Sequence, residues 1–183
     1  MPRIAQIIIN IVLFQIGWLV CVLSAVNNIA LISLLFAFTA IGFHLFFTPI
    51  RIKEIQMLFL VTLTGTAWET VMVQLGFMVY INGNIFEGLP PYWIIAMWLL
   101  FATTLNLSLR WLHGRMMLAA LLGMLFGPIT YFAGSKLGGV SFPETLSTIA
   151  IVAISWGVLM PMLAALAKRF DGFTVSNEGR YVS

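Results

Sequence analysis

The sequence predicts an all-α fold, a polytopic membrane bundle of six transmembrane helices with both termini in the cytoplasm. Of the 183 residues, 61% are hydrophobic and only 8% are charged, whereas a soluble domain carries about 25% charged residues. Six apolar stretches approach the length of about 20 residues that crosses the hydrocarbon core. The Lys and Arg residues gather in alternate short loops. These observations exclude a soluble globular domain, a disordered chain and a nucleic-acid-binding protein.

Turn-forming residues separate the six predicted spans, which cover residues 4–25, 29–48, 56–80, 92–109, 116–134 and 146–167. The breaks contain Asn27-Asn28, Pro49, Pro90-Pro91, His113-Gly114 and Gly138-Gly139, all of which favour turns. The first segment exceeds the apolar core of a signal peptide, so we expect it to be a retained helix. Residues 1–169 are thus predicted to form the transmembrane domain, and residues 170–183 a short polar cytoplasmic tail.

The positive charges predict the orientation of the chain. With the N-terminus in the cytoplasm, eight of the nine Lys and Arg residues lie on the inner side, as the positive-inside rule requires. These are Arg3, Arg51, Lys53, Arg110, Arg115, Lys168, Arg169 and Arg180, and only Lys136 lies outside. An odd number of helices would break this pattern.

Small residues recur at four-residue spacing in the last two predicted spans. The fifth span has Gly123 and Gly127 after Ala119, and the sixth has Gly157 after Ala153. Because lipid tails are as apolar as leucine, membrane helices associate through close packing at such residues. We expect these two helices to pack closely.

Glu69 is the most informative polar residue, because it lies near the middle of the third span. This reading places the other five acidic residues in loops or in the tail. A carboxylate at this depth costs at least a few kcal/mol, so it should face the bundle interior and be protonated or paired. Thr62, Thr66 and Glu69 share one helix face.

A helical rise of about 1.5 Å per residue sorts the remaining polar residues into two levels. The midplane level holds Glu69, Gln15, Ser155, Trp18, Trp68, Trp98 and Trp156, and the level nearer the cytoplasm holds His44, Asn106, Asn10, Thr62 and Thr103. The functional interpretation is a polar cavity that opens towards the cytoplasm, with Glu69 at its floor. The alternative is a protonated Glu69 that bonds to Gln15 or a threonine and only holds helices together.

No metal site or cofactor is predicted. The chain has two histidines, His44 and His113, and neither stands at the spacing of a metal motif. His44 has its own structural alternative, in which it bonds a backbone carbonyl or faces headgroups. Nucleotide-binding and hydrolase fingerprints do not occur.

A set of motifs gives the sequence a resemblance to a known family. They are Phe14-Gln15-x-x-Trp18, His44-Leu45, Gly65-x-x-Trp68-Glu69, Pro91-x-Trp93 with Trp98, Phe101-Ala102-Thr103-Thr104-Leu105-Asn106-x-Ser108-Leu109-x-Trp111-Leu112 and Gly127-Pro128-x-x-Tyr131-x-Ala133-Gly134-x-x-Leu137-Gly138. With them the chain resembles an uncharacterised family of small bacterial inner-membrane proteins, classed as a domain of unknown function. The acidic position of the third helix is often Asp in that family, and here it is Glu69.

The resemblance implies a multi-pass protein of the bacterial inner membrane and adds Tyr131 to the candidate site. Family genes lie near lipid-modifying enzymes of the cyclopropane-synthase type, which implies a role connected with membrane lipids. No activity comes with the family.

Three functions fit these features. The first is binding or transport of a lipid headgroup or small solute, with Glu69 as the protonatable group. The second is an accessory or structural subunit of a membrane-protein complex. The third is an intramembrane enzyme acting on lipid or quinone, with Glu69 as acid or base and His44 or Asn106 as an orienting group. The chain alone leaves these three open.

Overall fold

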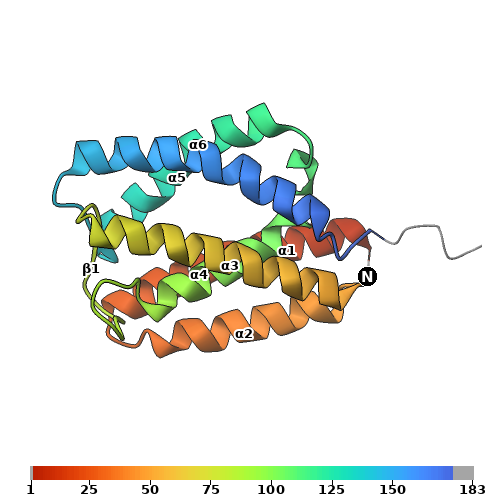
Figure 1. Ribbon diagram of the computed structural model, residues 1–183. Coiled ribbons are helices and arrows are strands. Elements are labelled where there is room, and N and C mark those ends of the chain that lie inside the picture. Colours follow the sequence, from red (N-terminus) through yellow and green to blue (C-terminus); the bar gives the residue numbers. More distant parts are fainter. Residues whose placement is uncertain (1, 175–183) are drawn as a thin grey trace, which may run out of the picture.

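The computed structural model describes residues 2–174, and in that part the chain forms helices joined by short connections. In chain order the elements are α1 (Arg3–Val26), α2 (Leu31–Phe46), α3 (Arg51–Gln74), β1 (Val79–Tyr80), α4 (Tyr92–Leu105), the 3-10 helix η1 (Arg110–Leu112), α5 (Met116–Lys136), β2 (Val140–Ser141) and α6 (Thr145–Arg169). Figure 1 shows α5 and α6 paired along one side, with α1 to α4 on the other. The prediction of an all-α bundle with six α-helices is confirmed.

Four of the helices are long and apolar enough to cross a membrane. They are α1, α3, α5 and α6, with 24, 24, 21 and 25 residues. The helices α2 and α4 are also apolar but have only 16 and 14 residues. At 1.5 Å per residue, α4 is about 21 Å long, which is shorter than a hydrocarbon core of about 30 Å. The four long helices indicate a multi-pass membrane protein.

Two predicted spans differ from the helices observed. The third helix runs over Arg51–Gln74 instead of residues 56–80. It starts earlier because the charged residues of its first turn can lie at the bundle end, and it stops before Gly76, whose φ of 74° does not continue a helix. The fourth helix ends at Leu105 instead of residue 109, and the chain then turns into η1.

The helix α4 lies at the centre of its side of the bundle. Nine of its 14 residues are buried, and it packs against α1, α2 and α3. Ala96 and Ala102 are fully buried in these contacts, because a methyl side chain lets neighbouring helices approach closely. This central position agrees with the absence of charged residues between Tyr92 and Leu105.

The helices α5 and α6 pack against each other through their glycines. A Cβ atom added at Gly123 would lie 2.2 Å from the backbone oxygen of Trp156, and one at Gly127 would lie 2.6 Å from Cγ of the same tryptophan. On α6, a Cβ at Gly157 would lie 2.6 Å from Cγ of Met124. Because α5 packs mainly on α6, its other side faces α1 and α4 without close helix packing.

The two ends of the bundle are held by different interactions. At one end β1 and β2 pair antiparallel, with Tyr80 opposite Val140. At the other end the backbone N–H of Ile50 donates to the oxygen of Gly172 at 2.9 Å, so the chain after α6 contacts the start of α3. The segment expected to be a free tail is therefore docked as far as Thr174, whereas residues 175–183, with Arg180, lie outside the described residues.

Candidate functional site

The carboxylate of Glu69 is the meeting point of three hydrogen-bond donors. The hydroxyl of Tyr80 donates to Oε2 at 2.7 Å, and the indole Nε1–H of Trp98 donates to Oε1 at 3.2 Å. The hydroxyl of Tyr131 also donates to Oε1. The Glu69 side chain is only 1% exposed. Four separate elements, α3, β1, α4 and α5, thus converge on one acidic group.

Local packing explains how the three donors reach this carboxylate. Gly65 lies one turn before Glu69 on α3, and the indole of Trp98 fills the space where a side chain would be, because a Cβ at Gly65 would lie 2.0 Å from the ring. Tyr80 is fixed by the pairing of β1 with β2. Any side chain at position 65 would therefore displace Trp98 from Glu69.

The charge on Glu69 has no basic partner in the part of the chain that the structure describes. Across residues 2–174 the ion pairs are His44 with Glu54 and Arg110 with Asp171. The donors around Glu69 are all neutral groups. The arrangement therefore offers hydrogen bonds to a carboxyl group but no counterion, and an ionised Glu69 without one would be costly at such a depth.

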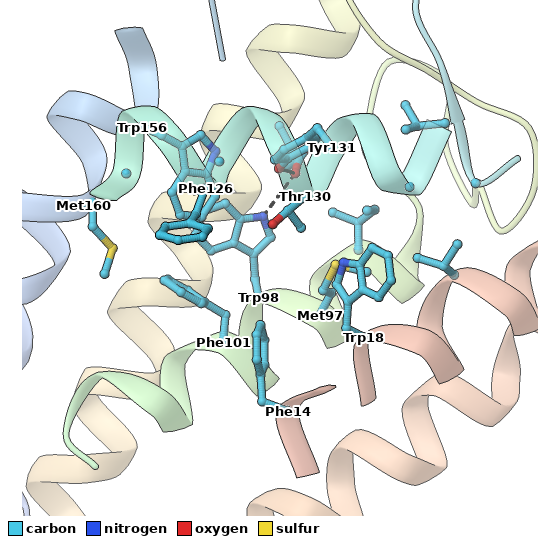
Figure 2. A pocket seen from close by; sticks show the side chains of 18 of the residues that line it. Phe14, Trp18, Met97, Trp98, Phe101, Phe126, Thr130, Tyr131, Trp156 and Met160 are labelled. Carbon is cyan, nitrogen blue, oxygen red and sulfur yellow. Dashed lines mark hydrogen bonds between the residues drawn. The ribbon is translucent and has the colours of Figure 1, made fainter. Parts of the chain in front are cut away.

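A cavity of about 360 Å³ lies beside this cluster, between α5 on one side and α1 and α4 on the other. Figure 2 shows side chains from several helices pointing into it, including Trp18 of α1, Trp98 of α4, Tyr131 of α5 and Trp156 of α6. Its walls are mainly aromatic and aliphatic, and the polar groups among them are Glu69, the two tyrosine hydroxyls, Thr130 and the indole N–H groups of the tryptophans. The expectation of a polar cavity is thus replaced by an apolar cavity with one polar corner.

The opening of the cavity lies partway along α5. Phe126 and Thr130 line the cavity and are both exposed, with 55% of Phe126 accessible. Phe126 stands ten residues after the start of α5 at Met116, which places it about 15 Å along a helix of about 31 Å. Trp111 is exposed at one end of the cavity. The cavity therefore opens to the side of the bundle at mid-length, and not only at the end expected to face the cytoplasm.

Three of the four tryptophans expected at the midplane, Trp68, Trp98 and Trp156, form an aromatic cluster beside this cavity. Trp98 and Trp156 stack with ring centroids 5.4 Å apart and planes 14° apart. Phe101 meets Trp156 edge to face at 5.5 Å, and Trp68 does so at 6.4 Å. Such ring pairs add stabilisation beyond the area they bury, so this part of the wall is preorganised.

A second buried cluster surrounds Glu54, which sequence reasoning had assigned to a loop. Glu54 is 0% exposed and lies in the first turn of α3. His44 Nε2 lies 2.8 Å from its Oε1, and the side-chain amide of Asn106 donates to Oε2 at 2.8 Å. The backbone N–H of Gly172 donates to the same oxygen at 3.2 Å. The helix α3, which is long and apolar enough to cross a membrane, therefore contains two buried carboxyl groups, Glu54 and Glu69.

The two clusters are far apart along α3. Fifteen residues separate Glu54 from Glu69, which corresponds to about 22 Å along the helix. His44 lines a different cavity of only about 20 Å³, together with Asn10 and Thr103. The structure thus brings His44 and Asn106 together, as the level argument predicted, but places them away from Glu69.

Several other candidates do not reach Glu69. Gln15 is exposed on the outside of α1, and Thr66 and Ser155 are only partly buried and do not line the cavity. The side chain of Thr103 accepts a hydrogen bond from Asn10 at 3.1 Å. The expected partners of Glu69, Gln15 or a threonine, are therefore replaced by Tyr80, Tyr131 and Trp98.

Sequence reasoning missed Tyr80, Glu54 and Asp171. Tyr80 was assigned to the end of a span, although it is in a strand. A signal for Glu54 did exist, because Glu54, Leu58 and Val61 repeat at the spacing of one helix face, and all three are buried. Asp171 pairs with Arg110 through a 2.5 Å contact, which no local pattern indicates.

Comparison with known proteins gives one match. The model of a family described as "Protein of unknown function (DUF2878)" matches residues 7–162. No curated protein and no solved structure matches the chain. The matched region covers most of the sequence, including Glu69 and the helices that enclose the cavity. The chain therefore belongs to the DUF2878 family, whose function is unknown.

Proposed function

We propose that this protein binds an amphipathic molecule of the membrane, whose apolar part occupies the aromatic cavity and whose polar group meets Glu69. The observation that carries this proposal is the position of one carboxylate, held by three neutral donors, in the wall of an otherwise apolar cavity. Binding pockets typically combine apolar walls with a few placed polar groups. Transport of the same molecule would use the same site.

The position of the opening supports a ligand that arrives from the bilayer. Phe126 and Thr130 lie about halfway along α5, at a depth where the surroundings of a transmembrane helix are hydrocarbon. A water-soluble solute would have to cross this layer. Lipids, or other molecules that dissolve in the bilayer, are therefore the proposed partners.

We also propose that α2 and α4 cross the membrane with the four long helices, giving six spans with both termini in the cytoplasm of a bacterial inner membrane. The pairing of Val79 with Ser141 joins the two loops assigned to the outside. The pair between Arg110 and Asp171 joins two segments assigned to the inside. The connections between helices are short, so α2 and α4 lie beside longer helices. Where α2 and α4 end within the hydrocarbon layer, the backbone of the adjoining loops can be buried against these neighbouring helices.

The two alternative functions have less support. The orienting groups expected for an enzyme, His44 and Asn106, are paired with Glu54 and do not lie near Glu69. An accessory subunit would be favoured by small residues exposed on α5 and α6. Instead, Gly123 and Gly127 are buried against Trp156.

The proposal is tested by measuring the molecules that remain bound to the purified protein. The protein is isolated in a mild detergent, and bound lipids are identified by native mass spectrometry. Thr130→Phe places a ring at the mouth of the cavity, and the matched control Ile129→Phe places the same ring on a neighbouring exposed position that does not line the cavity.

We expect a bound molecule on the wild-type protein and on Ile129→Phe, and at least about a tenfold loss of occupancy on Thr130→Phe. A tenfold change corresponds to about 1.4 kcal/mol, which a bulky group in the entrance can readily cause. Equal occupancy in the two variants would show that the bound molecule is not in this cavity and would refute the proposal.

A further inference from the structure

We infer that the molecule bound in the cavity carries a positively charged amine and no phosphate group. This inference rests on the proposed function, because it specifies the ligand class of the same cavity. Two observations carry it: the carboxyl group of Glu69 has no basic partner among the described residues, and aromatic rings line the same cavity.

The described lining of the cavity contains an acidic residue and no basic residue. Within the described part of the chain, the lining includes Glu69 but no Lys, Arg or His. The three donors stabilise the carboxylate by hydrogen bonds, yet they bring no positive charge. A cationic ligand would supply the missing counterion in a medium where Coulomb attraction is much stronger than in water.

The aromatic walls favour the same charge. The face of an aromatic ring is the negative end of its quadrupole, and Trp binds cations most strongly. Trp18, Trp98, Phe101 and Trp156 come from α1, α4 and α6 and line the cavity, so a ligand that fills the cavity lies among aromatic rings. Aromatic side chains are a known way to recognise ammonium ligands.

The same features exclude a phosphate. A phospholipid headgroup would bring its anion close to Glu69, and phosphate recognition uses Arg, Lys or a free helix N-terminus. No basic side chain lines the cavity among residues 2–174. Since the remaining lining is apolar and opens towards the side of the bundle, the rest of the ligand should be hydrocarbon or aromatic. The predicted class is a hydrophobic amine.

The test compares three probes that share one chain and differ in charge: decylamine, decanol and decanoate, each with a terminal bromine atom. Bromine quenches nearby tryptophans, and the chain has six. The protein is reconstituted in lipid nanodiscs and titrated with each probe at pH 7, and empty nanodiscs give the partition of each probe into lipid. Glu69→Gln removes the charge at the site, and Glu87→Gln removes one from an exposed loop as the matched control.

We expect the amine to quench at about tenfold lower membrane concentration than the alcohol, and the carboxylate to bind worst. In Glu69→Gln the amine should lose its advantage while the alcohol still binds, which also shows that this variant is folded. Glu87→Gln should behave like the wild-type protein. If Glu69→Gln fails to accumulate, the three-probe comparison on the wild-type protein decides alone.

The outcomes separate this inference from the proposed function. Equal binding of amine and alcohol to the wild-type protein would overturn the amine assignment and leave the binding cavity in place. If no probe gave saturable quenching and lipid occupancy were equal in Thr130→Phe and Ile129→Phe, the amine assignment and the proposed binding function would both be overturned. A preference for the amine that persists in Glu69→Gln would also overturn the inference, because the charge would then lie elsewhere.

Discussion

Replacing Glu54 by Ala should strongly destabilise the end of the bundle where the chain leaves α6. The side chain of Glu54 is 0% exposed and accepts three contacts, from His44, Asn106 and the backbone of Gly172. Glu54→Ala leaves all of these buried groups without their acceptor. Leaving a buried hydrogen-bonding group unsatisfied costs about 1–3 kcal/mol, so the loss of the acceptor for three partners should lower the free energy of unfolding by at least about 3 kcal/mol.

Glu54→Gln provides a graded comparison. Asn106 and Gly172 both donate to Oε2, so a glutamine can present its amide oxygen to both and turn its NH₂ group towards His44. A neutral His44 can accept there in its other tautomer. The expected cost is therefore smaller, about 1.5–3 kcal/mol, the value of a hydrogen bond to a charged group.

The assay is reversible unfolding in mixed micelles of a mild detergent and sodium dodecyl sulfate, together with hydrogen exchange of the peptide that contains Gly172. Gln56→Ala serves as the control, since Gln56 is exposed on the same helix and should change stability by no more than about 0.5 kcal/mol. Glu54→Ala should accelerate exchange at Gly172. A cost below about 1 kcal/mol with unchanged exchange would refute the idea that Glu54 holds this segment.

Two further substitutions test other contacts by the same unfolding assay. Gly123→Ala should cost about 1–3 kcal/mol by overpacking, because the new Cβ would lie 2.2 Å from the backbone oxygen of Trp156. The control Gly42→Ala has nothing within 4 Å of its new Cβ and should stabilise the protein by about 0.5–1 kcal/mol through helix propensity. Equal effects of the two substitutions would argue against close packing of α5 on α6. Arg110→Met should cost about 1–2 kcal/mol, since it leaves the partly buried carboxylate of Asp171 without its 2.5 Å partner, and an unchanged unfolding midpoint would show that this pair contributes nothing.

The sequence indicates the helices well and their ends less well. The polar backbone of a segment in lipid must satisfy its hydrogen bonds internally, so long runs of apolar side chains become helices. The third helix shows the limit. Its first turn contains Arg51, Lys53 and Glu54, so hydropathy alone predicts that the helix begins later, at residue 56. Burial of Glu54 depends on His44 and Asn106, which come from other parts of the chain.

The candidate site was only partly visible in the sequence for the same reason. Glu69 stands out because a lone carboxylate in an apolar helix is costly. The partners of Glu69 do not stand out in the sequence, because Tyr80 precedes a loop and Tyr131 is 62 residues away from Glu69. The apolar character of the cavity was also hidden, since it arises from rings of α1, α4, α5 and α6 that face one another only after packing.

The sequence by itself determined that this chain is a helical membrane protein and that Glu69 is an unusual residue within it. Composition and hydropathy suffice for both, because the bilayer acts on each helix separately. Only the tertiary structure decided what Glu69 meets, that Glu54 is buried with His44, and where the cavity opens. Those facts depend on contacts between helices, and such contacts depend on shape and distance that no single segment encodes.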